Sequence, residues 1–129
     1  MATRSRIGYQ MASGKIKSVY CHSDGYPSFT GVRLRDHYAD DVKKVRQLVA
    51  VGYLSVLEAT PKDSAMAAHN KGIKPSTDAG PDEFYDNGRN YSGAEFVYYI
   101  QQDGMILGSV VGGDPNWMPL DMLIEKFPD

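Results

Sequence analysis

The chain has 129 residues, of which 42% are apolar and 23% are charged, and its formal net charge is −2. These values are typical of one globular domain and exclude a long disordered chain. The single cysteine excludes an intrachain disulfide and a zinc site built on paired cysteines. Because no apolar run is long enough for a secretion signal or a membrane span, we expect a cytoplasmic protein without membrane association.

The charge is unevenly distributed along the chain. Residues 1–74 carry twelve basic and six acidic side chains, a difference of +6, whereas residues 75–129 carry two basic and ten acidic side chains, a difference of −8. Two explanations are open: the two halves pack together and neutralise each other, or they present charged surfaces to a partner.

Alternating apolar residues predict a β-hairpin near the start of the chain. Ile7, Tyr9 and Met11 recur at every second position, which is typical of a half-buried strand. Gly14 then supplies a turn before a second predicted strand at 15–20.

Two helices are expected next. Pro27 favours a helix start, and Asp40 or Asp41 can cap a second helix over residues 42–49. That helix has apolar residues at spacings of three and four and should end near Gly52.

The following segment, residues 60–92, is rich in Pro, Gly and Asn and predicts a long irregular loop. A second hairpin is expected around Asp103-Gly104, with strands at 95–100 and 105–111. A short amphipathic helix over 120–127 should close the chain.

These elements predict a single α+β domain over residues 1–129. It would consist of a hairpin-helix half (4–57), the loop (60–92) and a second hairpin-helix half (95–127). We expect the two hairpins to form one antiparallel sheet with helices packed on one face. Exposed edge strands of such a sheet make a homodimer plausible.

Cys21, His22 and Asp24 lie together where the first hairpin ends. His22 and Asp24 alternate along a strand, so they could form a metal pair or a His oriented by a carboxylate, with His37 as a third member. The alternative is an Asx-type turn in which these residues hydrogen-bond locally. A metal site needs three or four converging ligands, so we predict no metal and no cofactor.

Several residues are candidates for partner binding. Asp24 and Tyr26 belong to the polar turn after the first hairpin, and Trp117 lies between two prolines. The acidic residues Asp82, Glu83 and Asp86 could enter a basic groove on a partner protein, although a solvated acidic loop is the simpler explanation.

Nucleic-acid binding is a further possibility. It would use the basic residues Arg4, Arg6, Lys15 and Lys17 beside Tyr9 and Tyr20, but the sequence pI of about 5.9 argues against it. Neither glycine-rich phosphate-binding fingerprint occurs in the sequence, which excludes hydrolysis of the P-loop kind.

The N-terminal part carries a specific pattern. It includes Thr3–Gly8, Tyr20–Pro27, Gly31–Leu34, His37-Tyr38, Lys44-Val45 and the leucines and glycine of 48–57. With this pattern the chain resembles small uncharacterised proteins of tailed bacteriophages and prophages. Residues 95–99 and the Trp117 region are similar to that group as well.

The resemblance implies a phage accessory protein that works in the cytoplasm of an infected bacterium, and it implies no reaction. Our leading hypothesis is a non-enzymatic binding module that modulates or inhibits a host macromolecule, most plausibly a protein, in host takeover or anti-defence. One alternative is a small hydrolase or metal-dependent enzyme centred on His22, Asp24 and His37. Another is a small-ligand sponge, with the ligand held between the sheet and the loop.

Overall fold

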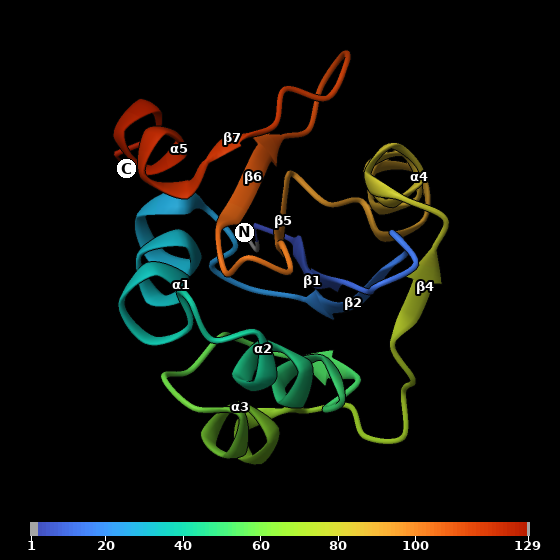
Figure 1. Ribbon diagram of the computed structural model, residues 1–129. Coiled ribbons are helices and arrows are strands. Elements are labelled where there is room, and N and C mark those ends of the chain that lie inside the picture. The colour runs from blue at the N-terminus through green and yellow to red at the C-terminus, as the bar shows by residue number, and fades with distance from the viewer. Residues whose placement is uncertain (1–2, 129) are drawn as a thin grey trace.

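The structure is a computed structural model that describes residues 3–128. It has the predicted α+β fold: one β-sheet lies at the centre, with helices packed against it (Figure 1). The strands are β1 (Ser5–Gln10), β2 (Ile16–Cys21), β3 (Tyr53–Leu54), β4 (Ser76–Asp78), β5 (Phe96–Ile100), β6 (Ile106–Val110) and β7 (Met118–Pro119).

Most of the helices lie between β2 and β5, and one follows β7. They are α1 (Val32–His37), α2 (Val42–Val49), α3 (Pro61–Ala67), α4 (Pro81–Asn87) and α5 (Leu120–Lys126), together with two short π-helical turns, η1 (Pro27–Gly31) and η2 (Gly88–Ser92). Helix α2 is the clearest product of local sequence. The Asp41 carboxylate accepts a hydrogen bond from the Lys44 amide at its N-terminus, and Val45, Leu48 and Val49 are buried.

Both predicted hairpins are confirmed. β1 pairs with β2, and β5 pairs with β6, each antiparallel. Our prediction of a purely antiparallel sheet is wrong, because the hairpins join through β1 and β5, which run parallel. Parallel neighbours need a long crossover, and the helical residues between β2 and β5 supply one.

The sheet order is β3-β2-β1-β5-β6-β7, and β4 also pairs with β2. β3 and β4 use different parts of the same strand: β3 pairs with Tyr20 and Cys21, whereas β4 pairs with residues 16–18. Two short segments therefore cover the outer edge of β2, and the two-residue β7 lies at the other edge. The homodimer stays a prediction. The short strands that cover both edges of the described sheet leave less free edge for a second copy than we expected.

Helices cover both faces of the sheet, contrary to our prediction of one face. Figure 1 shows α1, α2 and α5 on one side and α4 on the other. The larger apolar core lies under α1, α2 and α5 and includes Ile7, Val19 and Tyr98. The second core lies under α4 and consists of Ile16, Phe84, Tyr85, Ala94, Val97 and Tyr99, packed against Leu107, Val111 and Trp117.

The segment 60–92 is not the irregular loop that we predicted. It contains α3, β4, α4 and η2, and both α3 and α4 begin with a proline in the first turn. The Thr60 hydroxyl caps α3 by accepting from the Asp63 amide. The prolines and the Thr60 cap stabilise the helix starts, and the second core buries one face of α4. These contacts explain why this polar segment is ordered.

Within residues 3–128 no helix combines the length and the apolar character that a bilayer crossing requires.

Candidate functional site

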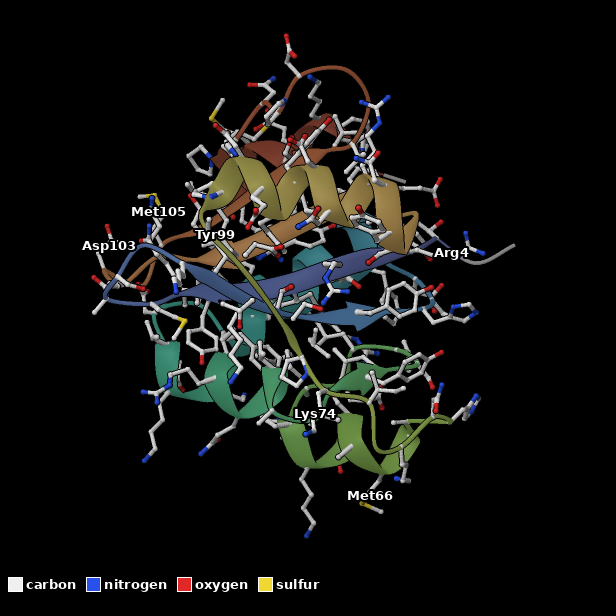
Figure 2. The ribbon with its side chains drawn as sticks, turned by 90° about the vertical axis from the view of Figure 1, so that its right-hand side faces the viewer. Arg4, Met66, Lys74, Tyr99, Asp103 and Met105 are labelled. Carbon is white, nitrogen blue, oxygen red and sulfur yellow. The ribbon has the colours of Figure 1, made fainter. Side chains whose placement is uncertain are left out.

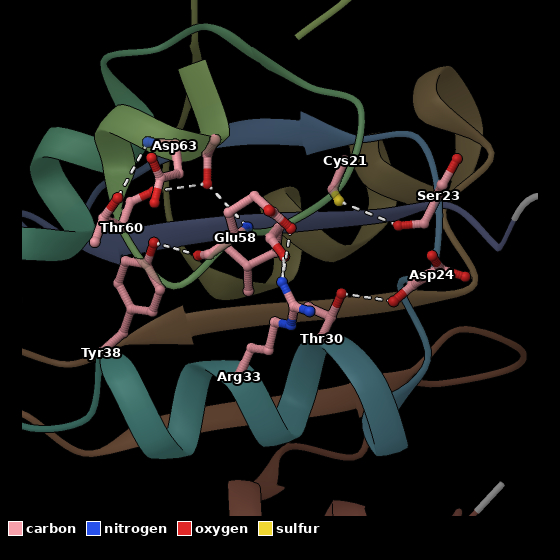
Figure 3. Close-up of polar contacts among 11 residues, drawn as sticks. Cys21, Ser23, Asp24, Thr30, Arg33, Tyr38, Glu58, Thr60 and Asp63 are labelled. Atoms are coloured by element: carbon pink, nitrogen blue, oxygen red, sulfur yellow. Dashed lines mark hydrogen bonds and ion pairs between the residues drawn. The ribbon is translucent and has the colours of Figure 1, made fainter. Parts of the chain in front are cut away.

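The residues at the end of the first hairpin make mainly structural contacts in the described structure. Cys21 is fully buried, and its thiol donates a hydrogen bond to the Ser23 carbonyl (3.5 Å; Figure 3). Burial raises the pKa of the Cys21 thiol to about 11. The reactive thiolate is therefore scarce at neutral pH, and Cys21 has the character of a small core residue.

His22 and Asp24 face different partners. The Tyr20 hydroxyl and His22 Nδ1 share a hydrogen bond of 2.8 Å, and the His22 amide donates to the Leu54 carbonyl. Asp24 has a positive φ of 58°, and its carbonyl accepts from the Thr30 hydroxyl (2.7 Å; Figure 3). The Tyr20–His22 and Thr30–Asp24 contacts are local, as the alternative allowed, but the Asp24 contact uses its backbone carbonyl and not the side chain of an Asx-type turn.

The third member of the proposed enzyme site, His37, is exposed at the end of α1. Among residues 3–128 no group of three or more His, Cys, Asp or Glu side chains is arranged to hold a metal ion. His22, Asp24 and His37 are therefore not part of such a group of metal ligands.

The turn beside these residues is anchored to the core. Tyr26 is half-buried against the larger core, and its ring lies 6.2 Å from that of Phe29. Gly25 is buried, and its carbonyl accepts a hydrogen bond from the Tyr98 hydroxyl at 2.7 Å. The turn thus has a clear structural role, and Asp24 keeps only partial exposure for contact with a partner.

Trp117 and the acidic residues meet at α4. Trp117 is half-buried and stacks on Phe84, with ring centroids 6.1 Å apart and an interplanar angle of 8°. Asp82 and Asp86 are exposed, and Glu83 accepts a hydrogen bond from the Ala79 amide. Trp117 therefore belongs to the second core, while α4 presents carboxylates to solvent.

The basic residues proposed to contact nucleic acid do not form one surface. Arg4 and Lys15 are exposed, but Arg6 is buried, 9% accessible, on the face covered by α4. Lys17 lies on the opposite face, because it is in register with Tyr9 on β1 and alternates with the buried Ser18. The strand pleat thus separates Arg6 from Lys17.

A basic groove lies between α2 and the first hairpin. Its volume is about 540 Å³, and it is lined by Tyr9, Lys17, Lys43, Arg46, Gln47, Val49 and Ala50. A second hollow of about 440 Å³ shares Tyr9 and Arg46 with it and extends over Gln10, Met11, Ala12, Val42 and Gln102. We call the two together the α2 groove.

The α2 groove combines cations with an apolar floor. Lys17 comes from β2, whereas Lys43 and Arg46 come from α2, and the Arg46 guanidinium carbon lies 5.8 Å from the centre of the Tyr9 ring. Among residues 3–128, no acidic side chain lines either hollow. Sequence analysis predicted the apolar spacing of α2 but missed the convergence of Lys43 and Arg46 with Lys17 and Tyr9. That convergence depends on how α2 crosses the hairpin.

The two charged halves of the chain are not neutralised by direct contact. The ion pairs within 4.0 Å among residues 3–128 are Arg33–Glu58 and Arg35–Asp36, and all four residues belong to the basic half. The exposed carboxylates of α4 and the cations of α2 lie on opposite sides of the sheet (Figure 1). The carboxylates of α4 and the cations of α2 are therefore too far apart to pair with each other.

Comparison of the chain with models of protein families, with curated proteins and with solved structures found no match.

Proposed function

We propose that this protein is a non-catalytic binding module whose α2 groove holds an acidic, partly apolar segment of a host protein. The observation that carries the proposal is the convergence of Lys17, Lys43 and Arg46 around a groove that has an apolar floor and no acidic lining residue. Such a surface complements carboxylates beside apolar side chains, and its charge would favour rapid encounter with a chosen partner.

A protein segment suits this groove better than a nucleic acid does. Val42 and Ala50 contribute apolar surface that phosphates cannot use, and Tyr9 is half-buried with Arg46 near its ring. The exposed α4 carboxylates Asp82 and Asp86 would also repel a long polyanion that extended from the groove onto that face of the molecule. The resemblance to phage proteins supports a bacterial host as the source of the partner and host modulation as the outcome.

The proposal can be tested by affinity capture from nuclease-treated bacterial lysate with three tagged proteins. These are the wild type, the double variant Lys43→Glu/Arg46→Glu and the control Lys62→Glu/Lys74→Glu, which makes the same charge change at exposed positions outside the groove. We expect one host protein to be retained by the wild type and the control but not by the groove variant. Its retention should weaken as salt is raised.

The partner should then be mapped. An acidic peptide from the captured protein should bind the wild type directly, and a peptide with Glu and Asp changed to Gln and Asn should not. Equal capture by all three proteins would show that the α2 groove is not the binding site. Retention that depends on nucleic acid, or tighter binding of a single-stranded oligonucleotide than of the peptide, would reject the protein segment as ligand.

A further inference from the structure

A second pocket lies on the opposite face of the sheet, between β1, β4 and the α4–η2 segment. It has a volume of about 340 Å³ and is lined by Arg6, Ser76, Thr77, Asp78, Asn87, Tyr91 and Ser92. Figure 2 looks onto this side of the molecule, where α4 lies over the sheet and the segment leading into β4 runs down across the hairpin. The volume is at the small end of the range for ligand pockets, so it suits one small molecule.

Two buried charges of opposite sign line this pocket. Arg6 is 9% exposed and Asp78 is 6% exposed, yet no nitrogen of Arg6 comes within 4.0 Å of an oxygen of Asp78. They are still close enough to interact, because the Asp78 carboxylate raises the pKa of Arg6 against the larger lowering caused by burial. Buried charges that do not touch are costly, which makes this pair unusual for a purely structural arrangement.

Arg6 is held in place but retains hydrogen-bonding capacity. Its Nε donates to the Ser18 hydroxyl (2.9 Å), Nη2 donates to the Ser18 carbonyl (3.1 Å), and Nη1 donates to the Ser92 hydroxyl (3.0 Å). A guanidinium has five N–H groups, so two remain after these three bonds. The fixed side chain thus offers donors to a ligand.

The other groups in the pocket complement these donors. Asp78 Oδ1 accepts from the Asn87 side chain (2.6 Å), and a carboxylate has room for further donors. Tyr91 is 85% exposed at the pocket, so its ring is free to cover a planar ligand. The pocket therefore presents donors, acceptors and an aromatic surface to the same small volume.

We propose that this pocket binds the guanine base of a free nucleotide. Arginine pairs characteristically with the O6 and N7 acceptors of guanine, and a carboxylate can accept from its N1–H and N2–H₂ groups. The Tyr91 ring would stack on the base, an interaction that aromatic side chains commonly make with nucleobases. This function is separate from the α2 groove and gives specific residues to the small-ligand hypothesis.

The ligand is tested by calorimetric titration of the full chain with GMP, IMP and AMP, which carry the same ribose and phosphate. We expect GMP to bind best, IMP to bind more weakly because it lacks the N2 amino group, and AMP to bind at least about tenfold more weakly than GMP. Equal binding of GMP and AMP, absence of GMP binding, or binding of free amino acids in preference to GMP would each overturn the proposal.

Two variants locate the site. Tyr91→Ala should weaken GMP binding about tenfold through lost stacking, while Met66→Ala, a change at a similarly exposed apolar residue on α3, should leave it unchanged. Asp78→Asn should lower the ratio of the AMP to the GMP dissociation constant. If Asp78 had only a structural role, its loss would weaken both ligands alike and leave this ratio unchanged. Because Tyr91 is so exposed, its variant tests the proposal even if Asp78→Asn fails to fold. An unchanged affinity in Tyr91→Ala would contradict the assignment.

Discussion

The hydroxyl of Tyr98 donates a hydrogen bond of 2.7 Å to the carbonyl of Gly25, a residue 73 positions earlier in the chain. Tyr98 is fully buried in the centre of β5, and burial raises its pKa well above the ordinary value. The bond therefore connects the second hairpin to the turn that follows the first.

Tyr98→Phe should destabilise the protein because it leaves the Gly25 carbonyl without this donor. We expect the free energy of unfolding in urea to fall by about 1–3 kcal/mol. Tyr91→Phe removes the same hydroxyl from an exposed ring and should change the stability by less than about 0.5 kcal/mol. Equal stabilities for the two variants would show that the connection contributes little.

The buried thiol of Cys21 predicts a loss of stability at alkaline pH. Its pKa is about 11 in the folded protein and 9.0 as the reference for the unfolded chain, so between these values the unfolded state releases the proton first. Stability should therefore fall as pH rises from 9 to 11, with a contribution from this group of up to about 1.4 kcal/mol per pH unit.

Cys21→Ala isolates that contribution. The variant should be less stable at pH 7 because it leaves a small cavity, but its unfolding free energy should decline less steeply above pH 9. Tyr38 and Tyr98, whose pKa values are also raised, remain in both proteins. In the native wild type, iodoacetamide should modify Cys21 only after unfolding, and rapid modification at pH 8 would contradict the inferred burial.

Glu58 is held from three directions in the network of Figure 3. Its amide donates to the Ser64 hydroxyl (2.9 Å), its carbonyl accepts from the Tyr38 hydroxyl (2.8 Å), and its carboxylate pairs with Arg33 (2.7 Å). Ser64→Ala removes the acceptor of the amide at a fully buried position, and we expect a loss of about 1–3 kcal/mol. Chemical denaturation would measure it.

Glu58→Gln is the matched change on the surface side of the network. The side chains of Arg33 and Glu58 are 34% and 37% exposed, so solvent screens their attraction and the loss should stay below about 1 kcal/mol. If Glu58→Gln lowered the free energy of unfolding more than Ser64→Ala, the ion pair would contribute more to stability than the hydrogen bond of the Glu58 amide, contrary to our expectation.

Substitutions at Gly52 and Gly14 distinguish the cost of a positive φ from the cost of a steric clash. Both have positive φ, 88° and 90°, but a Cβ on Gly52 would lie 1.8 Å from the Ile73 carbonyl oxygen, whereas a Cβ on Gly14 would meet nothing within 4 Å. Gly14→Ala should cost about 1 kcal/mol from the conformation alone. Gly52→Ala should cost clearly more, since residues 73–74 must move, and thermal unfolding would show the order.

The elements with strong local signals were predictable. The two hairpins follow from alternating residues and from Gly14 and Gly104, both of which have positive φ, and α2 follows from its Asp41 cap and apolar spacing. The parallel contact of β1 with β5 was not predictable, because it depends on how two distant hairpins dock and leaves no local mark. The predicted α+β class was therefore right, but the prediction that all strands run antiparallel was wrong.

The proposed pocket around Arg6 shows where sequence reasoning reached its limit. The alternation of Ile7 and Tyr9 already placed Arg6 on the other face of β1, but we predicted that face to be free of helices. Once α4 covers it, Arg6 becomes buried and shares a pocket with Asp78, which lies in the segment that we predicted as an irregular loop. Burial of a charge is a property of the tertiary arrangement, so composition alone could not indicate this pocket.

The short strands at the sheet edges also bear on how the protein behaves when it is abundant. β3 and β4 occupy the backbone groups of β2 that would otherwise template a foreign strand, and β7 ends in a proline. Fibril-like stacking of copies is thereby discouraged even at high protein concentration. Proteolytic nicking that freed residues 76–78 would unmask that template, so a clipped preparation should aggregate where the intact chain stays dispersed.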